Sequence, residues 1–201
     1  CWLWLGAFLS AAAMAQDTVL HWTFEHGNEG HITDLGPNGL HGTATAVTFM
    51  PGEPGRGMAG GFHADGARVD VPASEALAFD SSESFTVRLR LRAERSGGFS
   101  TVLMTKDRPG GTVSYSFTIG RWPGRLSLEL WSWQQVRVLS RARVDDGLWH
   151  HVVGCYDAPS NLAMLLVDGE LQAALPAGKG GPGTVLMRLG DNLDAHQQFL
   201  G

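Results

Sequence analysis

Four segments of the chain alternate apolar and polar residues, and their polar sides carry side chains suited to binding a ligand. The segments are residues 84–92, 113–119, 125–131 and 135–141. Successive residues of a β-strand point to opposite faces, so each segment gathers its polar side chains on one side. We expect these polar sides to form one surface with arginines, hydroxyl groups, a carboxylate and an aromatic ring. The candidate ligand-binding residues are Arg88, Arg90, Glu129, Trp131, Arg137 and, in the turn before residue 125, Trp122.

The chemistry of this predicted surface favours a carbohydrate ligand. Hydrogen-bonding side chains around a planar ring match the needs of a sugar, and the fork of an arginine also suits carboxylate or sulfate groups. The alternative is a solvated sheet face without a ligand, because an antiparallel sheet commonly carries one polar face in any case. In that alternative Glu129 pairs with an arginine, and Trp131 covers the aliphatic stem of a long side chain.

A glycoside hydrolase is the less favoured interpretation of the same residues. Such enzymes need two carboxyl groups about 5–10 Å apart. Glu129 is the only acid in the central strands, flanked by Ser127 and Trp131. One carboxylate cannot serve as both acid and nucleophile, so we expect no catalysis. The sequence also shows no phosphate-binding glycine loop and no serine-triad signature.

Two histidines and a cysteine lie near one another in the sequence but are poorly spaced for joint chemistry. His150 and His151 are adjacent, so in a strand their rings point to opposite faces and do not easily share a metal. Cys155 lies in an apolar run four or five residues further on, which is about 13–17 Å along a strand. We therefore interpret Cys155 as a small buried apolar residue.

The elements that must position these residues are short strands. Apolar residues alternate, or form short runs, in residues 18–24, 67–71, 84–92, 112–119, 125–131, 135–141, 148–156, 161–167, 170–174 and 184–189. Turn residues separate them, and Asp168-Gly169 is the strongest hairpin signal because a two-residue primed turn favours this pair. No segment of ten or more residues has a helical period. The chain is therefore predicted to be all-β, as a sandwich or a barrel.

Four blocks of sequence follow one another in a recognisable order. Residues 145–169 read DDGLWHHVVGCYDAPSNLAMLLVDG, and residues 22–42 read WTFEHGNEGHITDLGPNGLHG. Together with residues 60–72 and 85–91, these blocks resemble the laminin G-like, concanavalin A-like lectin/glucanase jelly-roll family. The resemblance covers about residues 18–200 and implies an antiparallel two-sheet jelly-roll sandwich. It also implies that the histidine pair is structural, with one ring buried and hydrogen-bonded and the other facing the second side.

The resemblance further implies a structural Ca²⁺ near the first strand and the loop that follows. Glu25, Asp34 and Asn38 carry oxygen ligands at this place, and backbone carbonyls would complete the usual set of about six to eight. The alternative is that Asp34 and Asn38 shape the turn, which both residue types do well.

The two ends of the sequence suggest a clipped, exported chain. Residues 1–15 are apolar and end in Ala13-Met14-Ala15, a cleavage pattern typical of a signal peptide whose basic n-region is missing. This stretch is shorter than the roughly 20 residues of a membrane span. The jelly-roll domain then covers residues 16–201, without the closing strand that family members carry. That absence would leave the strand at residues 18–24 with an open edge.

Composition limits the classes of function. The chain of 201 residues, 43% of them hydrophobic, is sufficient for one domain with its own core. A net charge of −5 argues against a nucleic-acid partner, which favours basic surfaces. We predict a secreted, extracellular or periplasmic binding module without enzyme activity. Its expected partner is a carbohydrate or glycoconjugate, for adhesion or for targeting an attached enzyme; the alternative is a structural or protein-interaction module.

Overall fold

The computed structural model describes residues 17–25, 30–94, 100–106, 113–119, 124–130, 136–178 and 185–191. These residues contain β-strands and one short 3-10 helix, Glu75–Leu77, and none of them lies in an α-helix. The prediction of an all-β chain is confirmed. Within the same ranges, no helix is long and apolar enough to cross a membrane.

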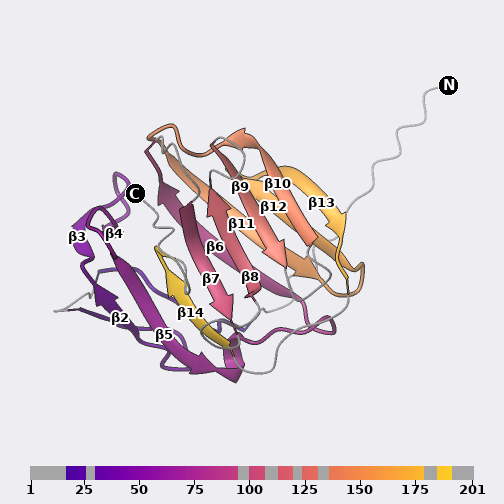
Figure 1. The fold of residues 1–201 in the computed structure, drawn as a ribbon, viewed down its shortest axis with the longest axis horizontal. Helices are drawn as coiled ribbons and strands as arrows, with labels where there is room; N and C mark the ends of the chain where they lie inside the picture. Colours follow the sequence, from indigo (N-terminus) through magenta and orange to yellow (C-terminus); the bar gives the residue numbers. More distant parts are fainter. Residues whose placement is uncertain are drawn as a thin grey trace.

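The larger sheet has eight strands, each antiparallel to its neighbours (Figure 1). In spatial order they are β1 (His31–Ile32), β2 (Gly42–Thr45), β5 (Arg68–Ser74), β14 (Val185–Leu189), β7 (Ser100–Lys106), β8 (Val113–Ile119), β9 (Arg125–Leu130) and β10 (Val136–Arg143). The late strand β14 inserts between two early ones, and the Arg188 guanidinium bonds to Asp70 of β5 across 2.6 Å. The order therefore depends on pairings between distant parts of the sequence.

The smaller sheet has four strands, and a separate hairpin lies beside the large sheet (Figure 1). The four strands are β13 (Glu170–Pro176), β12 (Leu162–Val167), β11 (Trp149–Asp157) and β6 (Phe85–Arg92). The hairpin consists of β3 (Thr48–Pro51) and β4 (Met58–Gly61). β6 pairs with β11 from Phe85 opposite Tyr156 to Arg92 opposite Trp149, and it is the last strand on its side of the described sheet.

The hydrophobic core lies between the two sheets. Buried and partly exposed residues alternate along the whole of β11, as the period of two predicts for a strand with one buried face. Gly154 of β11 shows how closely the layers approach. A Cβ added there would lie 2.4 Å from the ring of Phe117, which belongs to β8 of the opposite sheet. The predicted two-sheet jelly-roll sandwich is confirmed.

The hairpin predicted at Asp168-Gly169 joins β12 to β13. Both central residues have positive φ angles, 53° and 83°, as a type I′ turn requires. Val167 lies opposite Glu170, so the turn sets the register of the two strands. This prediction is confirmed.

Every strand predicted from the sequence is present except the one at residues 18–24. There the His21 N–H donates to Asp34, the His21 carbonyl accepts the Leu35 N–H, and Phe24 leaves the extended region with a φ of 61°. The prediction was wrong because alternation shows which side chains are covered and does not show whether the backbone has a ladder partner. Five of the described strands were not predicted: β1, β2, β3, β4 and β7. Among them, β2 and β4 were missed because GTAT and MAGG contain too few large apolar residues for a visible period.

Candidate functional site

Five polar residues gather on one face of the large sheet, across three neighbouring strands. Ser116 of β8 lies opposite Glu129 of β9, and Glu129 lies opposite Arg137 of β10. Thr118 and Ser127 form the adjacent pair. We call these five residues the Glu129 cluster.

Hydrogen bonds connect most of the cluster. The Ser127 hydroxyl donates to Glu129 Oε1 (3.0 Å) and lies 2.6 Å from the Thr118 hydroxyl. Arg137 adds two bonds, from Nε to Oε1 (2.9 Å) and from Nη2 to Oε2 (3.4 Å). The Glu129 side chain is 2% exposed and that of Arg137 is 28% exposed. A carboxylate this deeply buried needs such partners. Arg137 is the member of the cluster that is partly exposed to solvent.

Ser116 is the exception within the cluster. Its hydroxyl oxygen is buried, and it is the one buried side-chain N or O atom of the described residues that has no hydrogen-bond partner. An unsatisfied buried hydroxyl costs stability, so natural structures retain few of them. Its position opposite Glu129 therefore gives the cluster an unused hydrogen-bonding group beside a polar network.

The structure corrects the prediction of one continuous polar surface. Glu129 and Arg137 belong to the large sheet, but Arg88 and Arg90 lie on β6 of the small sheet. Alternation shows which side chains share a face of one strand, and it cannot show which strands share a sheet. Trp122 and Trp131 lie outside the described residues, so their part in a site remains a prediction.

The alternative interpretation of this face is confirmed in one respect and wrong in another. Glu129 does pair with an arginine, Arg137. The face is not simply solvated, however, because β9 is buried on both sides from Leu126 to Leu130. The partners described for Glu129 are hydroxyl groups and a guanidinium, and no second carboxylate is among them.

The residues predicted for calcium bind backbone groups. Asp34 accepts three N–H bonds of 2.8 Å, from His21, Gly36 and Leu40. Burial raises the pKa of Asp34, but these three donors and His41 outweigh it and hold the pKa below its ordinary value. Asp34 is therefore held as a carboxylate that faces N–H groups.

The other two predicted calcium ligands, Asn38 and Glu25, are also hydrogen-bonded to backbone groups. Asn38 donates from Nδ2 to the Val19 carbonyl (2.9 Å), and Glu25 Oε1 accepts the Met58 N–H (2.7 Å). In the part of the chain that the structure describes, no three His, Cys, Asp or Glu side chains converge as a metal site. This arrangement does not fit a shared calcium site and agrees with the turn-shaping alternative for Asp34 and Asn38. Calcium binding stays a prediction.

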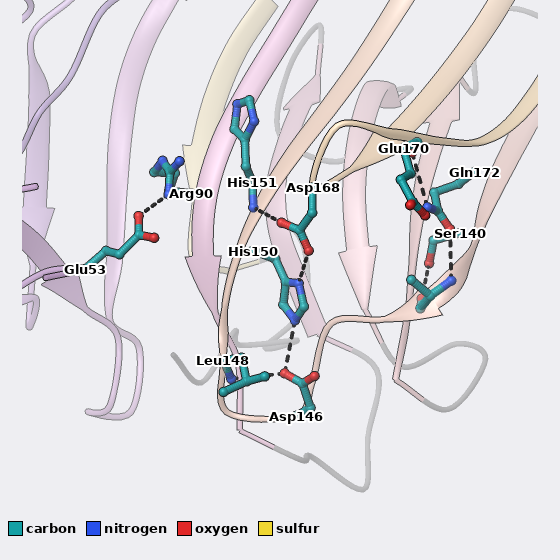
Figure 2. Close-up of polar contacts among 11 residues, drawn as sticks. Glu53, Arg90, Ser140, Asp146, Leu148, His150, His151, Asp168, Glu170 and Gln172 are labelled. Atoms are coloured by element: carbon teal, nitrogen blue, oxygen red, sulfur yellow. Dashed lines mark hydrogen bonds and ion pairs between the residues drawn. The ribbon is translucent and has the colours of Figure 1, made fainter.

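His150 is held between two carboxylates, as Figure 2 shows. Its Nδ1 lies 2.7 Å from Asp168 Oδ2, and its Nε2 lies 3.0 Å from Asp146 Oδ1. Asp168 also accepts the backbone N–H of His151 (2.8 Å). We call His150, Asp146 and Asp168 the His150 clamp. It ties the loop before β11 to the β12–β13 turn.

The clamp changes the pKa values of its members. Burial lowers the pKa of His150, but the bonds to Asp168 and Asp146 outweigh it, so the pKa lies above 6.5. The Leu148 N–H and His150 lower the pKa of Asp146. Burial raises the pKa of Asp168, but His150 and the His151 N–H bring it below its ordinary value. The expectation of one buried, hydrogen-bonded ring is confirmed, although the sequence did not reveal that both partners would be aspartates.

Comparisons with known proteins relate the chain to one family. A family model described as the concanavalin A-like lectin/glucanases superfamily matches residues 63–201. Domain 4 of AbnA, an extracellular arabinanase from Geobacillus stearothermophilus solved with arabinotriose, superposes with a TM-score of 0.64 at 16% identity, covering 91% of this chain and 87% of that domain. No curated protein matches.

Two toxin domains share the fold over most of the chain. The binding domain of Paraclostridial Mosquitocidal Protein 1 has a TM-score of 0.65 at 12% identity, covering 86% of this chain and 45% of that domain. The Botulinum neurotoxin serotype D binding domain has a TM-score of 0.59 at 11% identity, with 92% and 48% covered. The chain thus spans less than half the length of either toxin domain.

Proposed function

Because the chain belongs to the concanavalin A-like lectin/glucanases superfamily, we propose that it is a non-catalytic module that binds carbohydrate at the Glu129 cluster. The observation that carries the proposal is the Arg137 guanidinium, which is partly exposed and which the buried Glu129 carboxylate orients beside a network of hydroxyl groups. A guanidinium fork donates to the hydroxyl or carboxylate oxygens of a sugar, so Arg137 would be the residue that contacts the ligand. Arg137, at the exposed side of the cluster, gives it access to solvent.

Two further points support a binding role. AbnA domain 4, which shares the fold, was solved with arabinotriose. The cluster holds one carboxylate with hydroxyl and guanidinium partners, whereas glycoside hydrolysis requires two acids.

The apolar residues 1–15, with the cleavage pattern of a signal peptide, support export of the module from the cell.

The test uses Arg137→Lys in affinity electrophoresis against neutral and acidic polysaccharides. Lysine keeps a positive charge beside Glu129, so the fold should be retained, but it lacks the planar fork of the guanidinium. The same change removes one bond to the ligand, so we expect affinity to fall about 3–10-fold. Assays for new reducing ends accompany the binding measurement and should show no hydrolysis.

Ser140→Ala is the matched control. Ser140 lies on β10 like Arg137 but is fully buried, and its hydroxyl accepts the Leu126 N–H (2.9 Å) and donates to the Ala142 carbonyl (2.7 Å). This variant should lose stability and keep its affinity for the polysaccharide. Absence of retardation on every polymer would overturn the carbohydrate proposal and favour the protein-interaction alternative.

A further inference from the structure

The outer face of the small sheet carries a patch of apolar side chains. Along β11 and β12 every second residue is buried against the core, and the residues between them are partly exposed. The partly exposed residues of β12 are all apolar, whereas an antiparallel sheet with one covered face commonly carries polar residues on the other. We call this surface the β12 patch, and its members are Val153, Cys155, Leu162, Met164, Leu166 and, on β13, Leu171.

The patch is continuous and separate from the hydrophobic core. Val153 lies opposite Leu166, which in turn lies opposite Leu171, and Cys155 lies opposite Met164. Among the described residues, no member of the patch belongs to the core or to the partly buried side chains that pack against it. Leu171 is 49% exposed. Contiguous exposed apolar side chains are typical of an interaction surface.

Charges of opposite sign border the patch on its two long sides. On the β6 side, Arg88 and Arg90 are exposed, and Arg90 lies opposite His151. On the β13 side, the Asp168 N–H donates to the His151 carbonyl (2.8 Å). The turn that contains Asp168 and Glu170, both exposed, therefore lies level with Arg90 across the sheet, as Figure 2 shows. One side of the patch is basic and the other is acidic at the same height.

We propose that a second copy of this chain covers the β12 patch, so that the protein forms a symmetric dimer through the outer faces of its small sheets. Sheets that pack face to face keep their strand directions within about 30° of each other. A two-fold axis parallel to the strands places β6 of one copy over β13 of the other. Arg88 and Arg90 of each copy then face Asp168 and Glu170 of the other, while the two patches meet in the centre.

Other orientations fit the charges less well. A two-fold axis across the strands would place β6 over β6 and bring two rows of arginines together, and like charges repel. Within one copy, Arg90 also pairs with Glu53 of the β3–β4 hairpin, so Arg88 is the better residue for testing the charge contact. Asp157, an acid on the outer side of β11, lies at the end of that strand, where the crossing of the two sheets leaves it at the rim.

The area of the face is sufficient for a weak dimer. Strands lie about 4.8 Å apart and rise about 3.4 Å per residue, so four strands along the nine residues of β11 cover about 600 Å². Two copies would bury about 1,200 Å², which is the lower end of the range for specific interfaces. The Glu129 cluster lies on the large sheet, so this dimer leaves Arg137 of both copies outside the interface.

Sedimentation velocity of the 201-residue chain at increasing concentration tests the proposal. The wild type should pass from monomer to dimer with a dissociation constant of about 1–100 μM, as a small interface predicts. Leu166→Lys places a charge in the centre of the patch and should weaken dimerisation at least about 10-fold. Leu175→Lys is the matched control, because Leu175 is an exposed leucine of β13 that lies opposite the buried Ala163, on the other face of the sheet. It should leave dimerisation unchanged.

A charge exchange tests the orientation. Arg88→Glu should weaken dimerisation, and the double variant Arg88→Glu/Glu170→Arg should restore it, because the exchanged charges again face each other. Arg88 is exposed, so this pair remains informative if Leu166→Lys does not fold. A wild-type chain that stays monomeric up to about 1 mM would overturn the proposal. Association that is equally strong in Leu166→Lys, or a double variant as weak as Arg88→Glu alone, would also overturn it.

Discussion

Two buried carboxylates, Asp34 and Glu129, have different kinds of hydrogen-bond partner. Asp34 accepts three backbone N–H groups from a turn and from the N-terminal segment. Glu129 is bonded by side chains on neighbouring strands. Substitution at Asp34 therefore disturbs the path of the backbone. Substitution in the Glu129 cluster alters a buried side-chain network on strands whose backbone the sheet already fixes.

Asp34→Asn should lower the free energy of unfolding by about 2–3 kcal/mol. The amide retains one acceptor oxygen, but its NH₂ group faces an N–H donor, and charge-assisted bonds are the stronger kind. Urea denaturation measures the loss. We expect the loss to be the same with CaCl₂ and with a chelator. If calcium raises the melting temperature of the wild-type chain and not that of Asp34→Asn, the calcium prediction is supported instead.

The His150 clamp should give stability a maximum in mildly acidic solution. The raised pKa of His150 means that its contribution is complete below about pH 6.5 and is lost as the pH rises through the folded-state value. The lowered pKa values of Asp146 and Asp168 mean that theirs is present above about pH 3.8 and is lost at lower pH. Urea denaturation across this range should show the highest unfolding free energy between these limits.

The variant His150→Asn separates the clamp from other pH effects. It should be less stable than the wild type near pH 5 and should lose less stability between about pH 5 and pH 8. His63→Asn, which removes an exposed histidine, should retain the wild-type profile. If the unfolding free energy of His150→Asn falls as steeply with pH as that of the wild type, the pH dependence does not come from the His150 clamp.

At the scale of elements, the contact between β11 and β8 sets the distance between the sheets. Phe117 is fully buried and sits against Gly154, with Leu128 of β9 next to it. The alternation of β11 predicted from the sequence is present, but Cys155, which we expected to be buried, lies on the partly exposed face of the strand. The alternation did not reveal which aromatic ring would require a glycine at position 154, because that ring comes from the other sheet.

Gly154→Ala should destabilise the chain by about 1–3 kcal/mol, because the added methyl group overfills a packed layer. Phe117→Leu alone should also be destabilising, since it leaves a cavity. The double variant should be more stable than the sum of the two losses predicts, because the smaller side chain admits the methyl group. Additive losses in urea denaturation would show that the two residues do not limit each other.

At the scale of the whole molecule, the fold is assembled from distant pairings. β6 pairs with β11, and β14 pairs with β5, so the order of the strands in the sheets differs from their order in the sequence. The Arg188–Asp70 bond closes a loop of 118 residues. Such contacts form only after long segments of chain have been restricted, which costs conformational entropy.

Refolding should therefore be slow, with time constants between about milliseconds and seconds. Stopped-flow dilution from urea, followed by tryptophan fluorescence, measures the rate. We expect the Arg188–Asp70 bond to form late in folding. Breaking it by reversing the charge of one partner should therefore leave the refolding rate nearly unchanged and mainly accelerate unfolding. Refolding of the whole signal within less than a millisecond would contradict a topology dominated by distant pairings.

The sequence alone determined the local features of this protein. Period-two patterning located most strands, because side-chain alternation is a property of a single strand, and Asp168-Gly169 determined a turn from the φ angles that those two residues tolerate. The motifs of the sequence also identified the family. Only the tertiary structure decided that Arg88 and Glu129 lie in different sheets and that, among the described residues, the buried Ser116 hydroxyl lacks a partner. These features depend on which distant strands become neighbours, and that choice is made by the packing of the whole core.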